Sequence, residues 1–279
     1  MEISAAVVKA FRDKYGLPLM ECKRALVEAE GDEQKAIELL RKSGAKAMAS
    51  RGDRVTESGR IAIYTDPKKQ VTAMAELLCE SAPVASTEEF VALVNGLAEQ
   101  LATGPGAATP DELLAQQFPG KDITLKQAFD DLTNKIREVF KLTRIVRIEG
   151  PCGAYLHHNN AVGVLLPIEG DNTDLGKDIC MHIASMKPQV LSADQLSPAD
   201  VERERNIVAE TVRADEKNAK KPENVLQKII DGKMKDFFAE KTLLGQQFVK
   251  DATKTVQQVA EEGKIKIKDM IHWVLGVNK

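Results

Sequence analysis

The sequence predicts an α+β fold in three parts: a helical N-terminal domain, a core of two related strand–strand–helix halves, and an inserted antiparallel helical hairpin. Three observations predict it. Apolar residues recur at helical spacing through the first 44 residues, one hairpin pattern occurs twice, and two long helical patterns joined by a polar connector follow the second hairpin. Hydrophobic residues make up 43% of the 279 residues and charged residues 29%, which disfavours a disordered chain, a collagen-like fibre and a membrane bundle.

The N-terminal 45 residues are predicted to form a three-helix domain. The first stripe of apolar residues consists of Val7, Val8, Phe11 and Tyr15, and the second of Leu19, Cys22, Leu26 and Ala29. Gly16 ends the first helix, Asp32 caps the third and Gly44 stops it. Residues 46–60 are polar and without periodicity, so they are predicted to be a linker.

The core is predicted to contain an internal repeat, residues 61–145 and 146–279. Val71 follows Tyr64 by seven positions, and Val162 follows Tyr155 by the same number; each pair brackets a polar turn typical of a β-hairpin. A helix is expected after each hairpin. The first carries Phe90, Val94, Leu97 and Leu101, and the second Leu175, Ile179, Ile183 and Met186.

Further elements complete each half. Thr124 and Gln127 have capping-box spacing ahead of a helix that carries Phe129, Leu132, Ile136, Val139 and Phe140, and residues 144–149 are predicted to be a strand. Residues 198–241 contain two helical patterns, which predict an antiparallel helical arm that either folds back or binds a partner. Alternation in Ile271, Trp273 and Leu275 predicts a C-terminal edge strand.

The overall charge limits the classes of partner. A net charge of −3 and an isoelectric point near 5.9 are too balanced for a dedicated nucleic-acid binder. The N-terminus lacks the pattern of a signal peptide and no run approaches a membrane span, so we expect a cytoplasmic protein with no membrane partner. Four widely spaced cysteines without a CxxC pair predict reduced, mostly buried thiols.

No short motif indicates catalysis or nucleotide binding. The glycine-rich motifs that cradle phosphates and the signatures of hydrolases and kinases do not occur, and the chain has only four histidines. We therefore expect neither direct nucleotide binding nor a cofactor. An enzyme remains a minority alternative, because a site made only of carboxylates leaves no short motif.

One cluster of potential metal ligands requires weighing. It spans 31 residues and consists of Cys152, His157, His158, Cys180 and His182. On a helix, Cys180 and His182 point about 200° apart, so they are poorly placed to share a metal, and no metal site is expected. His182 is predicted to be a packed, hydrogen-bonded core histidine.

Two segments are candidate contact sites. The hairpin tip at His157 and His158 would project from its scaffold, although a turn that merely favours asparagine explains the same residues. Residues 81–84 are small, apolar and uncharged, and Pro83 is expected to end a strand; alone, this segment predicts only a loop.

Several spaced motifs together resemble one family, the bacterial elongation factor Ts proteins. In chain order they are Met20-Glu21-Cys22-Lys23-Arg24-Ala25-Leu26, Glu30-Gly31-Asp32, Leu40-Arg41-Lys42-Ser43-Gly44, Tyr155-Leu156-His157-His158, Met181-His182-Ile183-Ala184, Gly232-Lys233-Met234-Lys235 and Leu244-Gly245-Gln246-Gln247-Phe248-Val249. The resemblance covers nearly the whole chain. It implies an N-terminal domain of the ubiquitin-associated (UBA-like) type and a guanine-nucleotide exchange factor for the GTPase elongation factor Tu, acting by contact rather than as an enzyme.

The resemblance also implies contact residues. The N-terminal domain would meet the GTPase through Cys22, Lys23, Arg24 and Ala25, although Cys22 also fits the apolar stripe. His157 or His158 would make a second contact, the choice between them staying open, and Val249 with Lys250 would belong to a third. The resemblance does not decide whether the arm mediates a homodimer or supports the GTPase from another side.

The sequence departs from the family pattern at residues 81–84. Family members typically carry Thr-Asp-Phe-Val there, and the acid and ring are associated with displacing magnesium. This chain has Ser81, Ala82, Pro83 and Val84, so both groups are missing. Our hypothesis is that Pro83 acts as a shorter rigid wedge and that His157 or His158 does more of the work. The alternative is a non-catalytic UBA-like adaptor that binds a protein without driving exchange.

Overall fold

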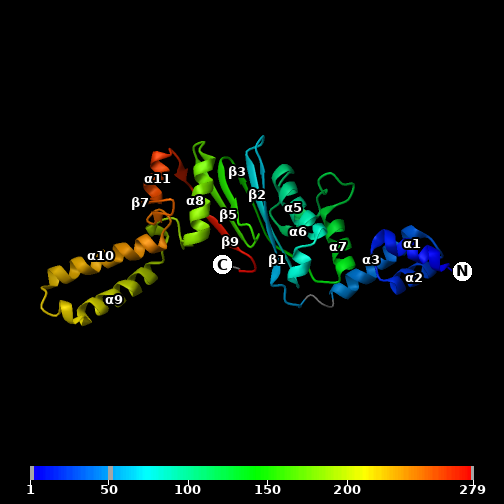
Figure 1. The fold of residues 1–279 in the computed structure, drawn as a ribbon, viewed down its shortest axis with the longest axis horizontal. Helices are drawn as coiled ribbons and strands as arrows, with labels where there is room; N and C mark the ends of the chain where they lie inside the picture. Colours follow the sequence, from blue (N-terminus) through cyan, green and yellow to red (C-terminus); the bar gives the residue numbers. More distant parts are fainter. Residues whose placement is uncertain (1–2, 50–52, 278–279) are drawn as a thin grey trace. The chain divides into compact units, whose positions relative to one another are not determined.

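A computed structural model describes residues 3–49 and 53–277 of the chain (Figure 1). Helices and strands are mixed along the chain, which confirms the α+β prediction. The chain forms two compact units. One contains the described residues of Met1–Glu149, Leu156–Gly163 and Trp273–Lys279, and the other contains Gly150–Tyr155 and Val164–His272. The predicted division at residues 45, 60 and 145 follows different boundaries and stays a prediction.

Three helices begin the first unit: α1 (Ala5–Tyr15), α2 (Leu19–Glu28) and α3 (Glu33–Ala49). The Ser4 side chain caps α1 by accepting a hydrogen bond from the Val7 N–H, and Gly16 ends that helix in the left-handed conformation at φ 66°. Their shared core is apolar and contains Val8, Phe11, Leu17, Cys22, Ala25, Leu26, Ala29, Ala36 and Leu40.

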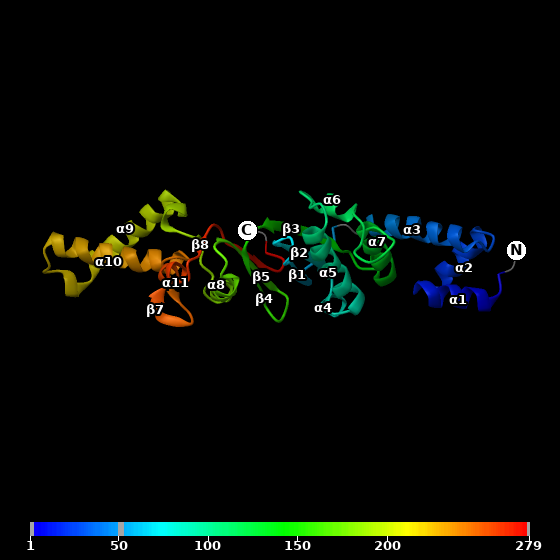
Figure 2. The same cartoon turned by 90° about the horizontal axis from the view of Figure 1, so that it is seen from above.

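The predicted end of the third helix at Gly44 is wrong, because α3 continues to Ala49. A single glycine within a helix costs only about 1 kcal/mol relative to alanine and does not by itself end the helix. Helix α3 also lies beside α7 (Leu125–Ile136) (Figure 2). A Cβ at Gly44 would lie 1.8 Å from Asn134 Oδ1. Residues 46–49 of the predicted linker lie in α3, and residues 50–52 of it lie outside the described part of the chain.

A three-stranded antiparallel sheet follows, in the order β1 (Ser58–Asp66), β2 (Val71–Cys79), β3 (Lys141–Glu149). The first predicted hairpin therefore forms, with Asp66 opposite Val71. Alternate side chains of β2 pack against α5 (Glu88–Thr103), which covers one face of the sheet (Figure 1). The short helix α6 (Pro110–Leu114) and α7 close this core.

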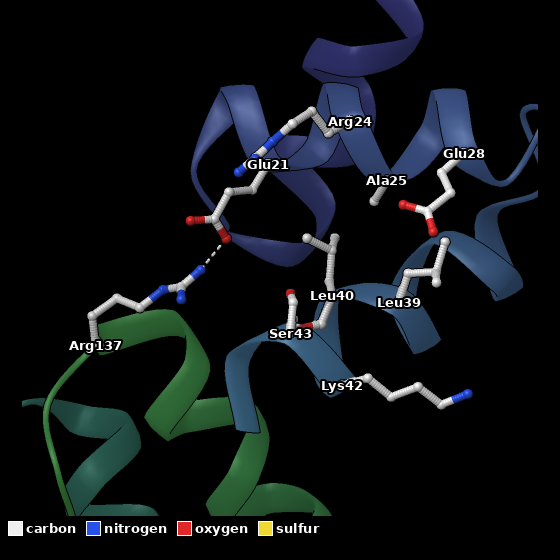
Figure 3. Close-up of a pocket in the computed structure, with 9 residues that line it drawn as sticks. All are labelled: Glu21, Arg24, Ala25, Glu28, Leu39, Leu40, Lys42, Ser43 and Arg137. Carbon is white, nitrogen blue, oxygen red and sulfur yellow. Dashed lines mark hydrogen bonds and ion pairs between the residues drawn. The ribbon is translucent and has the colours of Figure 1, made fainter. Parts of the chain in front are cut away.

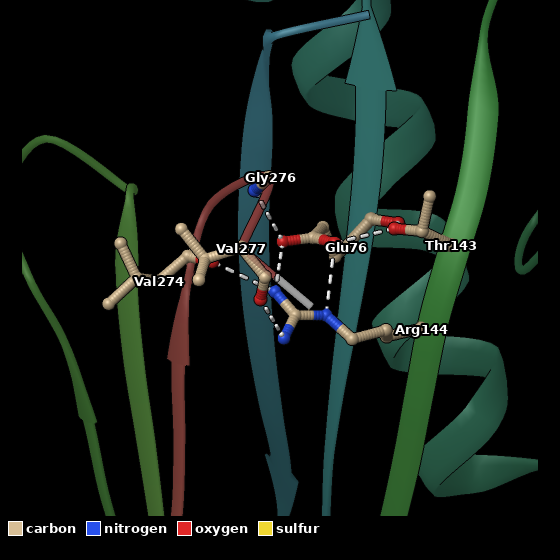
Figure 4. Close-up of polar contacts among 6 residues, drawn as sticks. All are labelled: Glu76, Thr143, Arg144, Val274, Gly276 and Val277. Carbon is tan, nitrogen blue, oxygen red and sulfur yellow. Dashed lines mark hydrogen bonds and ion pairs between the residues drawn. The ribbon is translucent and has the colours of Figure 1, made fainter. Parts of the chain in front are cut away.

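The opposite face of β2 carries a fully buried carboxylate, that of Glu76. It accepts hydrogen bonds from Thr143 Oγ1 at 2.5 Å, from Arg144 Nε at 3.0 Å and from the Gly276 N–H at 3.2 Å (Figure 4). The Arg144 guanidinium also donates to the carbonyl oxygens of Val274 and Val277 and lies 4.7 Å from the centre of the Trp273 ring. This charged pair thus fixes the C-terminal segment within the first unit.

Helix α7 ends earlier than predicted. Its capping box at Thr124 and Gln127 is present, but Arg137 takes the left-handed conformation at φ 67° and terminates the helix. Val139 and Phe140, expected on the helical stripe, are buried in the segment that leads into β3. The error arose because arginine rarely takes this conformation, so the sequence contained no local stop signal.

A second sheet contains β4 (Cys152–Leu156), β5 (Val162–Glu169) and β8 (Lys266–Ile267), and β9 (Ile271–Val274) also pairs with β5. The second predicted hairpin and the C-terminal strand are therefore present. In the second unit, α8 (Thr173–Met186) passes so close to β4 that a Cβ at Gly153 would lie 2.4 Å from the Gly176 carbonyl carbon.

The predicted arm is an antiparallel pair of helices, α9 (Pro198–Ala214) and α10 (Glu223–Lys241), which lie side by side (Figure 2). Its narrow core contains Val212, Leu226, Ile230 and Met234. The remaining elements are the short helical turns η1 (Ala193–Gln195) and η2 (Glu216–Asn218), the strands β6 (Gln247–Phe248) and β7 (Asp251–Thr255), and α11 (Val256–Glu262). Within the described residues, every helix is too short or too polar to span a bilayer.

Candidate partner-binding surfaces

Residues 81–84, which we call the 81–84 turn, leave the end of the central strand. Strand β2 ends at Cys79, Ser81 is extended, and Ala82–Ala85 form the one-turn helix α4. The expectation that Pro83 ends a strand in a loop is therefore wrong: Pro83 lies in the first turn of a helix, where the missing N–H of proline costs no hydrogen bond.

Ser81 is held by groups from two other places in the chain. Its N–H donates to Glu138 Oε2 at 3.0 Å and its hydroxyl to Glu138 Oε1 at 2.5 Å. The Cys79 thiol donates to the Ser81 carbonyl oxygen at 3.2 Å. Burial, with a smaller contribution from the Glu138 charge, raises the pKa of Cys79 to about 11, so this thiol stays protonated and remains a donor at neutral pH.

The turn presents two of its four side chains to solvent. Ala82 and Pro83 are exposed, whereas Val84 is half-buried against the core under α5. The Thr87 hydroxyl donates to the Val84 carbonyl oxygen at 2.9 Å and closes the turn on that side. A partner can therefore reach a small, rigid apolar surface formed by Ala82 and Pro83.

Helix α2 divides the four residues that the family pattern indicates. Lys23 and Arg24 are exposed, but Cys22 and Ala25 are buried among the three N-terminal helices. The Cys22 thiol points toward the Leu17 carbonyl oxygen at 3.6 Å, and burial raises its pKa. The Cys22 side chain thus supports the helix, and Lys23 and Arg24 are accessible to another molecule. Ala25 is 5% exposed and lines the groove between α2 and α3.

Two apolar residues on the same helix were missed by the sequence analysis. Leu19, expected in the core stripe, is 46% exposed, and Met20 is 65% exposed. Together with Lys23 they border a surface groove of about 570 Å³. The signal available was two large apolar residues directly after Pro18, in a first turn whose buried stripe begins only at Cys22.

A second groove, of about 550 Å³, lies between α2, α3 and the residue that ends α7 (Figure 3). Arg24 lines it, and an ion pair between Glu21 of α2 and Arg137 closes one side. The two side chains of this pair are about equally exposed, at 28% and 27%. This pair joins the helix that carries Lys23 and Arg24 to the end of α7.

The tip of the second hairpin projects two imidazoles. His157 accepts a hydrogen bond at its carbonyl oxygen from the Asn160 N–H, and Asn160 takes the left-handed conformation at φ 56°. His158 is exposed and His157 half-buried, with ring centres 4.2 Å apart. Within the first unit, the Ile61 N–H donates to the Asn160 carbonyl oxygen, which ties the tip to β1. Of the two rings, that of His158 is the more accessible to a partner.

In the second unit, Val249 and Lys250 lie in the turn between β6 and β7. Val249 is 51% exposed, and Lys250 pairs with Asp178 at 2.7 Å. The Val249 N–H donates to Nδ1 of the buried His182 at 3.2 Å, so Nε2 carries the ring proton and donates to Gln246 Oε1 at 2.8 Å. The prediction that His182 is a packed, hydrogen-bonded core residue is confirmed. Burial lowers its pKa.

Cysteine, histidine and acidic side chains are the possible metal ligands in the described part of the chain. The four cysteines, all within the described residues, are buried and form no disulfide, and burial raises the pKa of Cys180 well above its usual value. Over residues 3–49 and 53–277, no three histidine, cysteine or acidic side chains are grouped to hold a metal ion.

Comparison with known proteins identifies relatives along the whole chain. Residues 80–277 match the family described as elongation factor TS. A protein of Hydrogenobaculum sp. named elongation factor Ts is 36% identical over 278 residues, covering 99% of this chain and all of that protein. Proteins of the same name from Azoarcus sp. and Kineococcus radiotolerans are each 38% identical; the matches cover 99% and 92% of this chain and 91% and 92% of those proteins.

Proposed function

Because the chain belongs to the elongation factor Ts family and is thereby a translation elongation factor, we propose that it promotes release of GDP from elongation factor Tu by protein contact. Its work would be mechanical: it would disturb the magnesium and phosphate contacts of the GTPase and make or break no covalent bond. The site of this activity would be the cytoplasm, where we expect the protein.

The observation that supports this proposal most directly is the 81–84 turn. Ala82 and Pro83 are exposed at a fixed corner of the sheet, while Ser81 is held by hydrogen bonds to Glu138 and Cys79. A surface that displaces a ligand sterically has to keep its conformation on contact. Proline helps to keep it, because its ring fixes the φ angle. Pro83 would therefore act sterically, without the acid and the aromatic ring that family members carry there.

Further proposed contacts differ in chemistry. Lys23 and Arg24 offer cations beside the apolar surface of Leu19 and Met20, and His158 offers an imidazole at the hairpin tip. Val249 and Lys250 offer a short apolar and cationic turn. We propose that these surfaces supply binding, whereas the 81–84 turn and His158 act on the bound nucleotide's surroundings.

The proposed exchange obeys thermodynamic reciprocity. If the chain lowers the affinity of elongation factor Tu for GDP, then bound GDP lowers the affinity of elongation factor Tu for the chain by the same factor. The direct experiment loads the cognate elongation factor Tu with fluorescent GDP, adds the full chain with excess unlabelled nucleotide, and follows the fluorescence. We expect the release rate to rise with chain concentration and to saturate, and we expect GTP to dissociate the complex.

The second candidate function is that of a UBA-like adaptor, which binds a protein without driving exchange. The exposed Leu19 and Met20, together with the absence of an acid and an aromatic ring in the 81–84 turn, favour this alternative. The same experiment separates the two. A chain that binds elongation factor Tu but leaves the rate of GDP release unchanged would be an adaptor, and the exchange proposal would be wrong.

A further inference from the structure

Two carboxylates link the 81–84 turn to the segment that follows α7. One lies beside the turn and the other lies in the segment after the helix. Glu138 accepts from the N–H and the hydroxyl of Ser81 at 3.0 and 2.5 Å. In the opposite direction, Glu80 Oε1 accepts from the Val139 N–H at 2.8 Å, and its Oε2 accepts from Arg54 Nη1 at 3.0 Å. Each of the two acids thus accepts a hydrogen bond from a main-chain N–H of the other segment.

The segment after α7 also contacts the N-terminal domain. Arg137, Glu138 and Val139, which we call the 137–139 connector, are consecutive, and the left-handed conformation of Arg137 turns the chain between them. Arg137 forms its ion pair with Glu21, two residues before Lys23 on α2 (Figure 3). One connector therefore contacts both the 81–84 turn and the helix that carries the proposed docking cations.

Geometry decides what each contact can contribute. Two hydrogen bonds from one residue to a carboxylate fix both its position and its orientation, and hydrogen bonds to a charged group are about twice as strong as neutral ones. The pair of Glu21 and Arg137 is partly exposed, so it restricts α2 more weakly. The connector thus holds the turn firmly and biases the placement of α2.

We propose that the 137–139 connector positions the exchange machinery: Glu138 holds the 81–84 turn in the conformation that acts on elongation factor Tu, and Arg137 holds α2 in the conformation that docks. Both are positioning residues, since neither is argued to touch the GTPase. This inference rests on the proposed exchange function.

The two roles are separable by kinetics on the full chain. We expect Glu138→Gln to lower the maximal rate of GDP release about tenfold, equivalent to about 1.4 kcal/mol, with the half-saturating concentration unchanged. We expect Arg137→Gly, which suits the left-handed conformation, to raise the half-saturating concentration about threefold with the maximal rate unchanged. Asp130→Asn on α7, at a half-buried carboxylate that pairs with Lys126, is the matched control and should change neither quantity.

Hydrogen exchange on the free chain gives a second readout that does not need the GTPase. Glu138→Gln should speed exchange at the Ser81 amide, which bonds to Glu138, and at the Ala85 amide, which bonds to the Ser81 carbonyl oxygen, while leaving β2 protected. Glu138→Asp should restore part of the protection. If Glu138→Gln leaves both amide exchange and GDP release unchanged, or if both variants alter the same kinetic parameter, the inference is wrong although the exchange function stands. If the unaltered chain fails to speed GDP release, the proposed function is wrong, and the inference falls with it.

Discussion

Glu76 and Glu138 each receive hydrogen bonds from residues distant in sequence, but they lie in different surroundings. Glu76 is fully buried on the central strand and is paired with the Arg144 guanidinium. Glu138 is half-buried after α7 and receives its bonds from the uncharged groups of one serine. Glu76 therefore ties the C-terminal segment to the sheet, whereas Glu138 fixes a short turn at the surface.

The contrast shows where a carboxylate stabilises the fold and where it shapes a contact surface. Removing one member of a buried ion pair leaves the other member charged and without its partner in a medium that solvates it poorly. Removing a half-buried carboxylate lets water replace it, so the turn loses its orientation while the fold persists. The first change should appear in stability and the second in function.

The largest effect should follow Glu76→Gln. This change leaves Arg144 without its countercharge and weakens the bonds from Thr143 and Gly276, so the free energy of unfolding should fall by about 3–5 kcal/mol in urea titrations. Glu149→Gln, at a carboxylate that is 72% exposed, is the control and should change it by less than about 0.5 kcal/mol. A loss below about 1 kcal/mol for Glu76→Gln would show that the pair is not a structural anchor.

A smaller effect should follow Ser81→Ala, which removes the hydroxyl bond to Glu138 and keeps the main-chain bond. We expect the free energy of unfolding to fall by about 1 kcal/mol, with a measurable loss in the maximal rate of GDP release. Ser81→Thr keeps the hydroxyl and should restore the rate. Equal rates for the alanine and serine forms would mean that the hydroxyl has no part in orienting the turn.

The smallest effect is a pH dependence of the free energy of unfolding that arises from His182. This buried imidazole accepts a hydrogen bond and can also bind a proton. Burial lowers its pKa in the folded chain below its usual 6.5, so the unfolded chain binds the proton first as the pH falls. Its contribution to stability is therefore complete above pH 6.5 and is lost as the pH falls from there toward the folded pKa. Urea titrations of the chain and of His182→Gln between pH 7.5 and 5.5 should show a steeper loss for the unaltered chain. Parallel curves would contradict this assignment.

Local patterns predicted the helices and hairpins because each depends on neighbours in sequence. The capping box at Thr124 and the seven-residue spacing from tyrosine to valine in each hairpin are signals of this kind. The errors arose where distant contacts decided the outcome. Gly44 stays helical beside Asn134, and Arg137 ends α7 before the apolar Val139 and Phe140.

Family resemblance in the sequence indicated the candidate contact residues, but the sequence did not indicate the residues that hold them in place. Cys22 and Ala25 share a motif with Lys23 and Arg24, and only burial separates the supporting residues from the exposed ones. Glu138 lies 57 positions from Ser81, and no spacing rule links acids at that distance. Such partners become apparent only once the strands and α7 are packed together.

The central claim is that a small, rigidly held turn speeds nucleotide release from elongation factor Tu. Its most direct test replaces residues 81–84 with glycine in the full chain and measures release of fluorescent GDP by stopped flow, with binding to nucleotide-free elongation factor Tu measured in parallel. We predict that binding persists while the release rate falls toward that of the GTPase alone. Unchanged stimulation of release would contradict the claim and would remove the turn from the mechanism.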